Sequence, residues 1–466
     1  MLKYLGFGLS AAGGLALMLL QPVAALSHQA QLLLGGVVIA LSLWIFRPFS
    51  LPLSVGGFAL AAFALAIGLP PETVFHGLTQ NAVWTLAGAL FFGCALQKTG
   101  LGRRIALGVL RLFRPSYGSL AVAWTLIGLA LSALTPSITV RVAITAPIAA
   151  NCCELCKLAP RSRGSALIQL TAFVMAMLPG GGWLSGTLTG AVLQGAYEMT
   201  PGLTGLLDFS SWLRAALLPT ELAAAFVLIL ALVFLRPREP LGPQAAEALR
   251  AVRSGPLTRR EICAAAVLTA AFVLFATAGL HGIPAAAVCL GAAVLLFALG
   301  VLEPTDVGTG VSWDLVLFIG FSLSLGPMLS ATGITEWLTG LVVPLLRPFA
   351  GNPWLFVAAV TTALFLWHLV DVASFMPTLS LVPAMLPGVR EAFGIHPLVF
   401  VPMLSLAAIS FVLAYQNIWA LMARSAAGRQ AWTAKQLAVY GLCYFAAVLA
   451  ALLLCVPLWQ RWGWFG

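Results

Sequence analysis

Leu134-Thr135-Pro136-Ser137-Ile138-Thr139-Val140-Arg141 interrupts an apolar segment that runs from about residue 120 to residue 150. A proline removes a backbone donor and frees a carbonyl group, and in hydrocarbon other groups must satisfy what is freed. Hydroxyl and guanidinium side chains surround this proline, and an ionisable residue in a membrane segment marks a functional site by default. Secondary transporters bind substrates at broken helices of this kind. The stretch predicts either a substrate site or a proline kink whose hydroxyl groups cap the break.

The composition indicates a polytopic membrane protein. Of the 466 residues, 61% are hydrophobic and 8% are charged, whereas a soluble domain carries about a quarter charged residues. A span needs about 20 apolar residues, which gives roughly a dozen spanning or re-entrant segments. We expect no nucleic-acid partner, because much of the net charge of +10 lies in loops, where it would orient the chain.

The only long hydrophilic stretch, residues 236–262, divides the chain into two halves of similar size. It is rich in arginine, so the positive-inside rule predicts that it faces the cytoplasm. We therefore expect N-terminal scaffold helices at 1–70 and a first repeat at 71–235. The cytoplasmic linker at 236–262 and a second repeat at 263–466 follow.

A short motif recurs in the two halves. Gly93-x-x-Leu96-x-x-Thr99-Gly100-Leu101 in the first half matches Gly326-x-x-Leu329-x-x-Thr332-Gly333-Ile334 in the second. The segment that leads to the first copy, residues 74–100, fits either one helix or two half-helices of a re-entrant hairpin. Repeats that carry interrupted segments in corresponding positions point to a transporter binding site.

Polar interruptions follow each copy of this motif. About 40 residues after it comes a break: the opening stretch in the first half and His368 to Thr378 in the second. Each half then ends with a polar tip, at Gly180 to Gly190 and at Tyr415-Gln416-Asn417. The same order of motif, break and tip in both halves predicts a pair of related units.

This order resembles the divalent-anion/sodium symporter family, within the ion-transporter superfamily that includes arsenite permease. Leu96 to Gly102 and Trp313 to Gly333 are similar to that family's two re-entrant hairpins. Ser137-Ile138-Thr139 with Pro147 fits the register of the family's Ser-Asn-Thr motif, and Asp371-Val372-Ala373-Ser374 matches its acidic residue three before the second Ser. The resemblance implies an all-α polytopic membrane protein with about 11 transmembrane helices, two re-entrant hairpins and two inverted-topology repeats.

The resemblance also implies a function. It predicts a secondary active transporter of small anions, not an enzyme, that works by alternating access in the bacterial cytoplasmic (inner) membrane. Its partners would be the lipid bilayer, a second copy in a homodimer and a di- or tricarboxylate or sulfate. The candidate substrate-binding residues are Ser137, Thr139, Arg141, Thr187, Thr189, Ser374, Thr378 and Asn417. The candidate coupling-ion residues are Ser137, Thr139, Gly186, His368 and Asp371.

Three residues depart from the family motifs. Ile138 replaces the first Asn, and Phe375 and Met376 stand where Asn and Thr are expected. Sodium needs hard oxygen ligands, which hydrophobic side chains do not supply. Sodium coupling through backbone carbonyl groups, proton coupling and exchange against another anion therefore all remain open, and no cofactor beyond Na+ or H+ is expected.

Two features with charged residues bear on the choice between these coupling modes. Arg141 falls where the family has a small polar residue, and its guanidinium fork suits a carboxylate or sulfate. The alternative is that Arg141 pairs with Asp371, because buried charges are usually paired. His368 and Asp371 are three residues apart, so on a helix they share a face and would carry protons or stabilise the break.

Two other classes of protein fit less well. A channel would not need inverted broken repeats. An intramembrane enzyme would need a catalytic constellation, and the sequence has no HExxH motif. Cys152-Cys153-Glu154-Leu155-Cys156 contains a CxxC spacing, but no second pair or nearby His completes a metal site, so no metal is expected.

Overall fold

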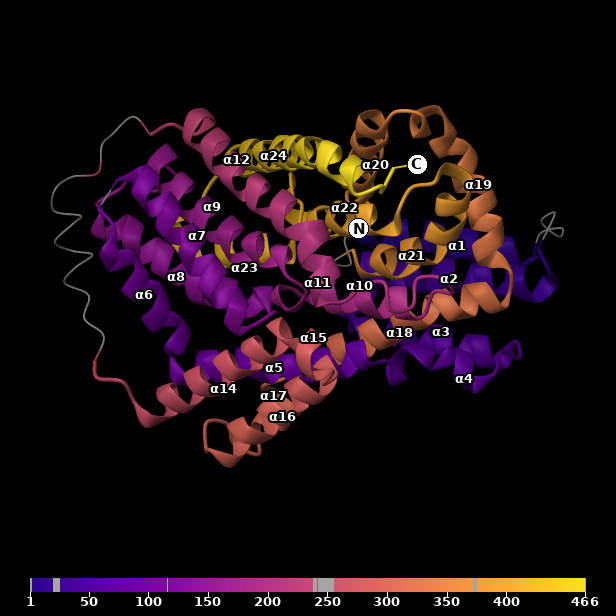
Figure 1. The fold of residues 1–466 in the computed structure, drawn as a ribbon, viewed down its shortest axis with the longest axis horizontal. Coiled ribbons are helices and arrows are strands. Elements are labelled where there is room, and N and C mark those ends of the chain that lie inside the picture. Colours follow the sequence, from indigo (N-terminus) through magenta and orange to yellow (C-terminus); the bar gives the residue numbers. More distant parts are fainter. Residues whose placement is uncertain are drawn as a thin grey trace.

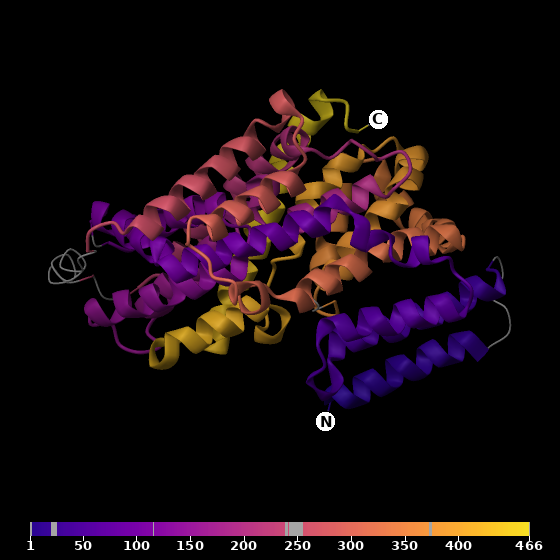
Figure 2. The same cartoon turned by 90° about the horizontal axis from the view of Figure 1, so that it is seen from below.

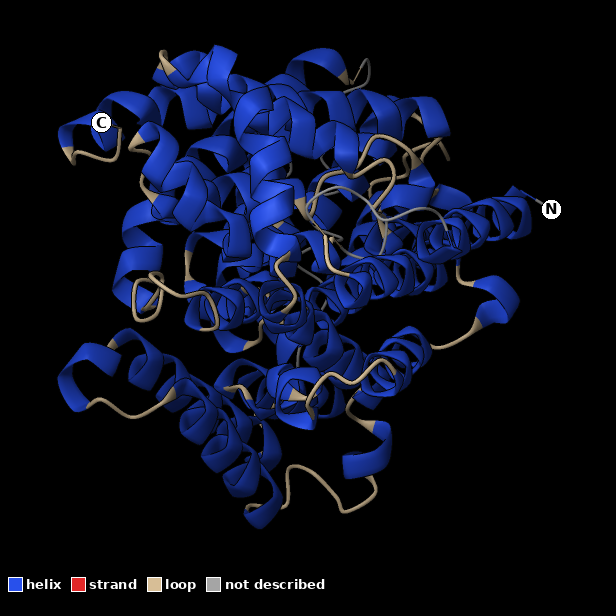
Figure 3. Cartoon of the chain, turned by 90° about the vertical axis from the view of Figure 1, so that its right-hand side faces the viewer, coloured by secondary structure: helices blue, strands red, loops and turns tan. Residues whose placement is uncertain are grey.

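The computed structural model describes residues 2–19, 26–114, 116–237, 241, 255–371 and 375–465. Within these ranges the regular structure is entirely helical, as Figures 1 and 3 show. Seven of the described helices are long and apolar enough to cross a membrane. Helices satisfy their backbone groups internally, which is why apolar sequences of this length adopt them in hydrocarbon.

Three N-terminal helices form one edge of the molecule, seen in indigo in Figure 2. They are α1 (Leu2–Leu19), α2 (His28–Phe46) and α3 (Leu53–Ala66). Helix α1 packs on α2, α2 packs on α3, and α3 packs on α18 (Trp313–Ala331) from the second half of the chain. The Asp314 carboxylate accepts hydrogen bonds from the backbone N–H groups of Leu53 at 3.2 Å and Ser54 at 2.8 Å. A carboxylate at a helix N-terminus is favourable, so this contact fixes α3 to α18.

The recurring glycine motif forms a corner between two helices in each half. Helix α5 (Asn81–Thr99) passes through Gly100, with φ of 75°, into α6 (Leu101–Leu112). Helix α18 ends in the same way at Gly333, with φ of 77°, before α19 (Ile334–Ala350). A left-handed corner of this kind favours glycine because it has no Cβ atom.

The position expected for the re-entrant hairpins needs correction. Helices α5 and α18 are each continuous over 19 residues, so residues 74–100 contain a single long helix rather than two half-helices. The polar residues Gln80 and Asn81 lie at the start of α5 and do not form a hairpin tip. The interruptions come later, at the two breaks.

Each break joins two helices. In the first half, α7 (Tyr117–Leu134) and α8 (Ile138–Leu155) are joined by residues 135–137. In the second half, α20 (Pro353–Trp367) and α21 (Met376–Phe393) are joined by residues 368–375. We call these connections the first and second break.

A broken helix follows each break. Helix α9 (Arg163–Met177) leads through two short 3-10 turns to α10 (Leu188–Glu198). Helix α22 (Phe400–Ala407) leads through residues 408–417 to α23 (Ile418–Ala427). We call residues 178–187 the glycine loop and residues 408–417 the second tip loop.

The two halves pack on each other reciprocally. Helix α8 after the first break packs against α23, and α21 after the second break packs against α10. The helices that close each half, α12 (Leu218–Phe234) and α24 (Ala434–Arg461), pack side by side (Figure 1). The division into two repeats stays a prediction from the sequence.

The remaining helices lie around this core. Helix α16 (Ala285–Ala298) packs along α5 and α14 (Arg259–Ala276). Most of the expected cytoplasmic linker, residues 238–240 and 242–254, lies outside the described residues. The short helices are α4 (Pro71–Val74), α11 (Phe209–Trp212), α15 (Ala278–His281) and α17 (Asp306–Thr309).

Candidate functional site

The first break is satisfied by its own hydroxyl groups. Ser137 caps α8, because its Oγ accepts a hydrogen bond from the backbone N–H of Val140 at 3.4 Å. The backbone N–H of Ser137 in turn donates to Thr135 Oγ1 at 3.2 Å. Both hydroxyl side chains are buried. Thr139, the second residue of α8, accepts from Trp419 Nε1 of α23 at 3.0 Å, which ties the start of α8 to the second half.

Arg141 is the charged residue at this break. Its side chain is 0% exposed, and none of its guanidinium nitrogens has a hydrogen-bond partner among the described residues. The expected pairing with Asp371 is wrong, because no ion pair to Arg141 occurs within the described ranges. A buried charge without compensation is strongly unfavourable, so this guanidinium is available for a bound anion.

The glycine loop lies directly against Arg141. A Cβ atom on Gly180 would overlap the Nη1 atom of Arg141 and would come within 2.6 Å of the Gly186 carbonyl oxygen. Trp183 Nε1 of the same loop donates to the Ser132 carbonyl at 3.4 Å, at the end of α7. The absence of a side chain at Gly180 is therefore what lets the loop and the first break meet.

Two candidate threonines follow the glycine loop. Thr187 and Thr189 are both buried, and their Oγ1 atoms form a hydrogen bond of 2.6 Å. Thr187 is the N-cap residue of α10, although its side chain makes no capping hydrogen bond. The pair therefore places two hydroxyl groups at the N-terminus of α10, where the helix dipole favours an anion.

The second break holds a separate set of contacts. His368 Nδ1 is 2.8 Å from Ser410 Oγ in the second tip loop. Thr378 Oγ1 donates to Asp371 Oδ2 at 2.5 Å and accepts from Trp367 Nε1 at 2.9 Å. Ser374 lies outside the described residues.

The prediction that His368 and Asp371 share one face of a helix is wrong. Helix α20 ends at Trp367, so neither residue lies inside a helix. Each has its own hydrogen-bond partner, Ser410 or Thr378. Phe375 enters α21 with φ of 59°, which is unusual for a residue other than glycine, and its ring packs 5.1 Å from the His368 ring.

Asn417 brings the second tip loop to the first half. Its Oδ1 accepts from the backbone N–H of Ala420 at 3.1 Å and so caps α23. Its Nδ2 donates to the Ile409 carbonyl at 3.2 Å and contacts Met177 Sδ at 3.8 Å. Met177 ends α9 just before the glycine loop, so the second tip loop contacts the end of α9 here.

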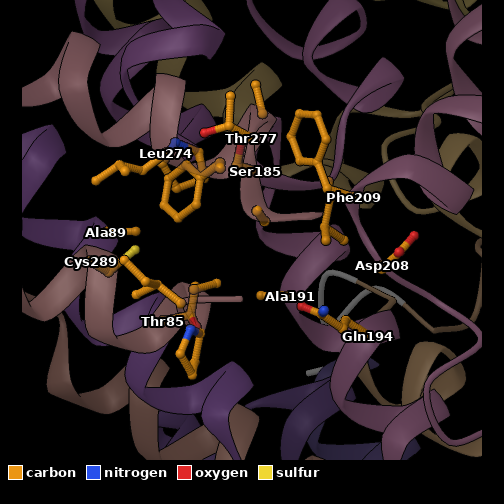
Figure 4. Close-up of a pocket in the computed structure, with 18 of the residues that line it drawn as sticks. Thr85, Ala89, Ser185, Ala191, Gln194, Asp208, Phe209, Leu274, Thr277 and Cys289 are labelled. Atoms are coloured by element: carbon orange, nitrogen blue, oxygen red, sulfur yellow. The ribbon is translucent and has the colours of Figure 1, made fainter. Parts of the chain in front are cut away.

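A cavity of about 730 Å³ borders the glycine loop. Pro136, Ser185 and Thr187 line it, and Ser185 is one of the lining residues labelled in Figure 4. The wall is mostly apolar, and among its described lining residues only Asp208 carries a charge. Arg141 is buried and is not among the residues that line the cavity, although it contacts the glycine loop at Gly180.

Several polar residues of the cavity wall were not predicted from the sequence. Thr85, Gln194 and Thr277 are among them. Each is a single polar residue in or beside an apolar helix, and such a residue carries no motif or spacing that distinguishes it. Ser410 and Trp419, which bond to candidate site residues, were also missed for this reason.

A family model for the sodium:sulfate symporter transmembrane region matches residues 9–464. The chain belongs to this family. The sodium:sulfate symporter match confirms the predicted resemblance and the class of protein, an integral membrane secondary transporter of anions. In this chain, a guanidinium without a hydrogen-bond partner among the described residues contacts a glycine loop whose later residues line a cavity.

Relatives agree with the family match. A "membrane protein" of Cupriavidus necator is 27% identical over 402 residues, which are 83% of this chain and 76% of that protein. The L-tartrate/succinate antiporter of Escherichia coli K12 is 27% identical over 365 residues, 75% of this chain and 71% of the antiporter. The chloroplastic dicarboxylate transporter 1 of Arabidopsis thaliana is 25% identical over 303 residues, and only 54% of its length is matched.

A solved structure shows the same fold. The YdaH transporter of Alcanivorax borkumensis has a TM-score of 0.57 at 16% identity, over 84% of this chain and 88% of that one. At this identity the likeness concerns the fold alone. It confirms the predicted all-α polytopic membrane architecture.

Proposed function

We propose that this protein carries a small dicarboxylate by alternating access, with Arg141 as the residue that binds the anion's charge. The observation that carries this proposal is the buried guanidinium without a partner among the described residues. A guanidinium forms paired hydrogen bonds to a carboxylate. Relatives whose names include tartrate/succinate and dicarboxylate transport favour this substrate class over sulfate.

Access to Arg141 requires movement. The cavity reaches Pro136 at the first break and Ser185 and Thr187 at the glycine loop, whereas Arg141 is fully buried and does not line it. An anion that enters the cavity meets hydroxyl groups first and reaches the guanidinium when the loop and the break separate. Small hinge movements of this kind are how carriers expose a central site to each side in turn.

Coupling is proposed to be independent of sodium. Ile138, Phe375 and Met376 are buried apolar side chains at the positions where the family motifs place polar ones. Among the remaining oxygens, Ser137 Oγ caps a helix and Thr139 Oγ1 accepts from Trp419. A fixed positive charge on Arg141 would neutralise the anion as a bound cation would.

Two further features belong to the proposal. His368 and Asp371, at the second break, face the second tip loop and Thr378, and they remain candidates for a proton pathway there. The homodimer and the cytoplasmic position of the linker at 236–262 are also proposed, from the family resemblance and from the loop charge.

A counterflow assay tests the proposed function. Purified protein in liposomes loaded with unlabelled succinate should accumulate radiolabelled succinate from outside, and liposomes without protein should not. Tartrate should compete strongly, and citrate and sulfate weakly. Counterflow distinguishes a carrier from a channel, which shows none. Strong competition by sulfate with none by dicarboxylates would contradict the proposed substrate class.

A further inference from the structure

The glycine loop also contacts the segment that leads into α12 and the start of that helix. Trp212 Nε1 donates to the Gly181 carbonyl at 3.0 Å. A Cβ atom on Gly182 would lie 3.0 Å from Leu217 Cδ1 and 3.3 Å from Glu221 Oε1. The segment Leu213–Leu217 that leads into α12 is a π-helix, a geometry frequent at functional sites. The loop therefore meets Arg141 of α8 at Gly180 and this segment and the start of α12 at Gly181 and Gly182.

Glu221 is a carboxyl group in an unusual position. Its Oε1 atom is buried and has no hydrogen-bond partner among the described residues, and the neighbouring Thr220 hydroxyl is in the same situation. Glu221 is the single acidic residue in the apolar span Phe209–Phe234. The side chain as a whole is half-buried, and an ionised carboxylate with one oxygen buried without a partner is unfavourable, which favours binding of a proton.

The charged groups around α12 offer little to balance an ionised Glu221. Helices α7 and α22, which pack on α12, carry no charged residue, and α9 and α24 carry theirs only near their ends. The glycine loop carries none. Arg214 of the π-helix stacks over the Trp462 ring at 5.0 Å. Arg141 contacts the same loop at Gly180, two residues before the glycine that faces Glu221.

We propose that Glu221 is a proton-binding residue that couples proton movement to anion transport across the glycine loop. This deepens the proposed function and rests on it. When Glu221 is ionised, its negative charge opposes an anion at Arg141 through a low-dielectric region. When a proton from solvent binds the carboxylate, that opposition is removed and the anion binds more tightly. By linkage, a bound anion also makes Glu221 hold its proton more tightly, so proton and anion move together.

The test compares two modes of transport by the full-length protein in liposomes. One is counterflow of radiolabelled succinate at equal pH on both sides, and the other is succinate accumulation driven by an acidic exterior. For Glu221→Gln, we expect counterflow within about threefold of wild type and gradient-driven accumulation reduced by about tenfold or more, since a neutral amide mimics only the protonated state. Glu336→Gln, the same chemical change at an exposed position of α19, should leave both modes unchanged.

A binding measurement keeps the proposal testable if the variant transports poorly. Succinate added to detergent-solubilised wild type in weak buffer should cause proton uptake, which Glu221→Gln should abolish and Glu221→Asp should retain. Gradient-driven accumulation or proton uptake that persists in Glu221→Gln would overturn the proposal, as would wild-type succinate transport indifferent to a pH gradient. A wild-type protein that moves no dicarboxylate would contradict the proposed function itself, and the coupling role would fall with it.

Discussion

Arg141 and Gly180 are in such close contact that a methyl group on Gly180 would overlap the arginine's Nη1 atom. The guanidinium is otherwise without a hydrogen-bond partner in the described part of the chain. The contact joins the first break to the glycine loop, which are separated by about 40 residues in sequence. We infer that the position of this loop controls whether an anion can reach the charge.

Gly180→Ala should therefore impair transport. The added methyl group would displace Arg141 or the loop, because the Gly186 carbonyl and Ser132 crowd the same space at 2.6 and 2.8 Å. We expect succinate counterflow to fall about tenfold or more, since displacement of about 1 Å at a site can cost a hundredfold.

Gly181→Ala provides the matched control for that experiment. A Cβ atom at Gly181 would meet Thr220 Cγ2 at 3.5 Å, an ordinary contact. This variant should keep counterflow near the wild-type rate. Equal loss in both variants would show that the loop merely fails to tolerate side chains and that the Arg141 contact is not decisive.

Arg141→Ala should abolish anion transport, whereas Ser137→Ala should reduce it only in part. Ser137 contributes one long capping hydrogen bond of 3.4 Å, and loss of a cap costs about 1 kcal/mol. Arg141 contributes the fixed charge that the anion needs. Initial rates of succinate uptake, normalised to folded protein by size-exclusion chromatography, check this order. The account fails here if Arg141→Ala transports as well as Ser137→Ala.

The sequence located the breaks well but not the corners. Pro136 and the hydroxyl groups around it predicted an interruption, and the structure begins α8 at Ile138. Gly100 and Gly333 carried an equally clear repeat, yet they form left-handed corners after continuous helices. A glycine motif reports a turn of the backbone, and it does not tell whether the chain then reverses inside the membrane or continues at its edge.

Contacts between residues far apart in the sequence were harder to predict. Arg141 and Asp371 were natural partners by charge, but Asp371 bonds to Thr378 seven residues away. Glu221 carried no motif at all, and its importance emerges only because α12 packs against the glycine loop. Long-range packing decides which buried charges meet, and periodicity within one segment cannot show it.

An ion pair at the membrane edge should make stability depend on pH. Arg104 Nε lies 2.7 Å from Glu261 Oε1, and Arg104 also donates to the Gly255 and Pro256 carbonyl groups. Its hydrogen bond to the Glu261 carboxylate lowers the pKa of that group to about 2. Because the folded-state pKa is depressed, the stabilisation is present above the unfolded value of about 4.3 and is lost as pH falls toward 2.

The melting temperature of Glu261→Gln should accordingly be a few degrees below that of wild type at pH 7, and this difference should narrow at about pH 3. Thermal unfolding in detergent at the two pH values measures the difference. Glu303→Gln is the control, because the Glu303 side chain is 52% exposed and exposed ion pairs contribute little. A gap of the same size at both pH values would show that the charge of Glu261 is not what stabilises α14.

The central claim is that the fixed charge of Arg141 replaces bound sodium in anion binding. The most direct measurement is the initial rate of radiolabelled succinate uptake into proteoliposomes with sodium replaced by choline at fixed pH. We predict that the rates in sodium and in choline lie within about twofold of each other, because Ile138, Phe375 and Met376 offer a cation no side-chain oxygen. Burying a cation without ligands costs several kcal/mol. A steep, saturable dependence on sodium with a Hill coefficient above one would contradict the account.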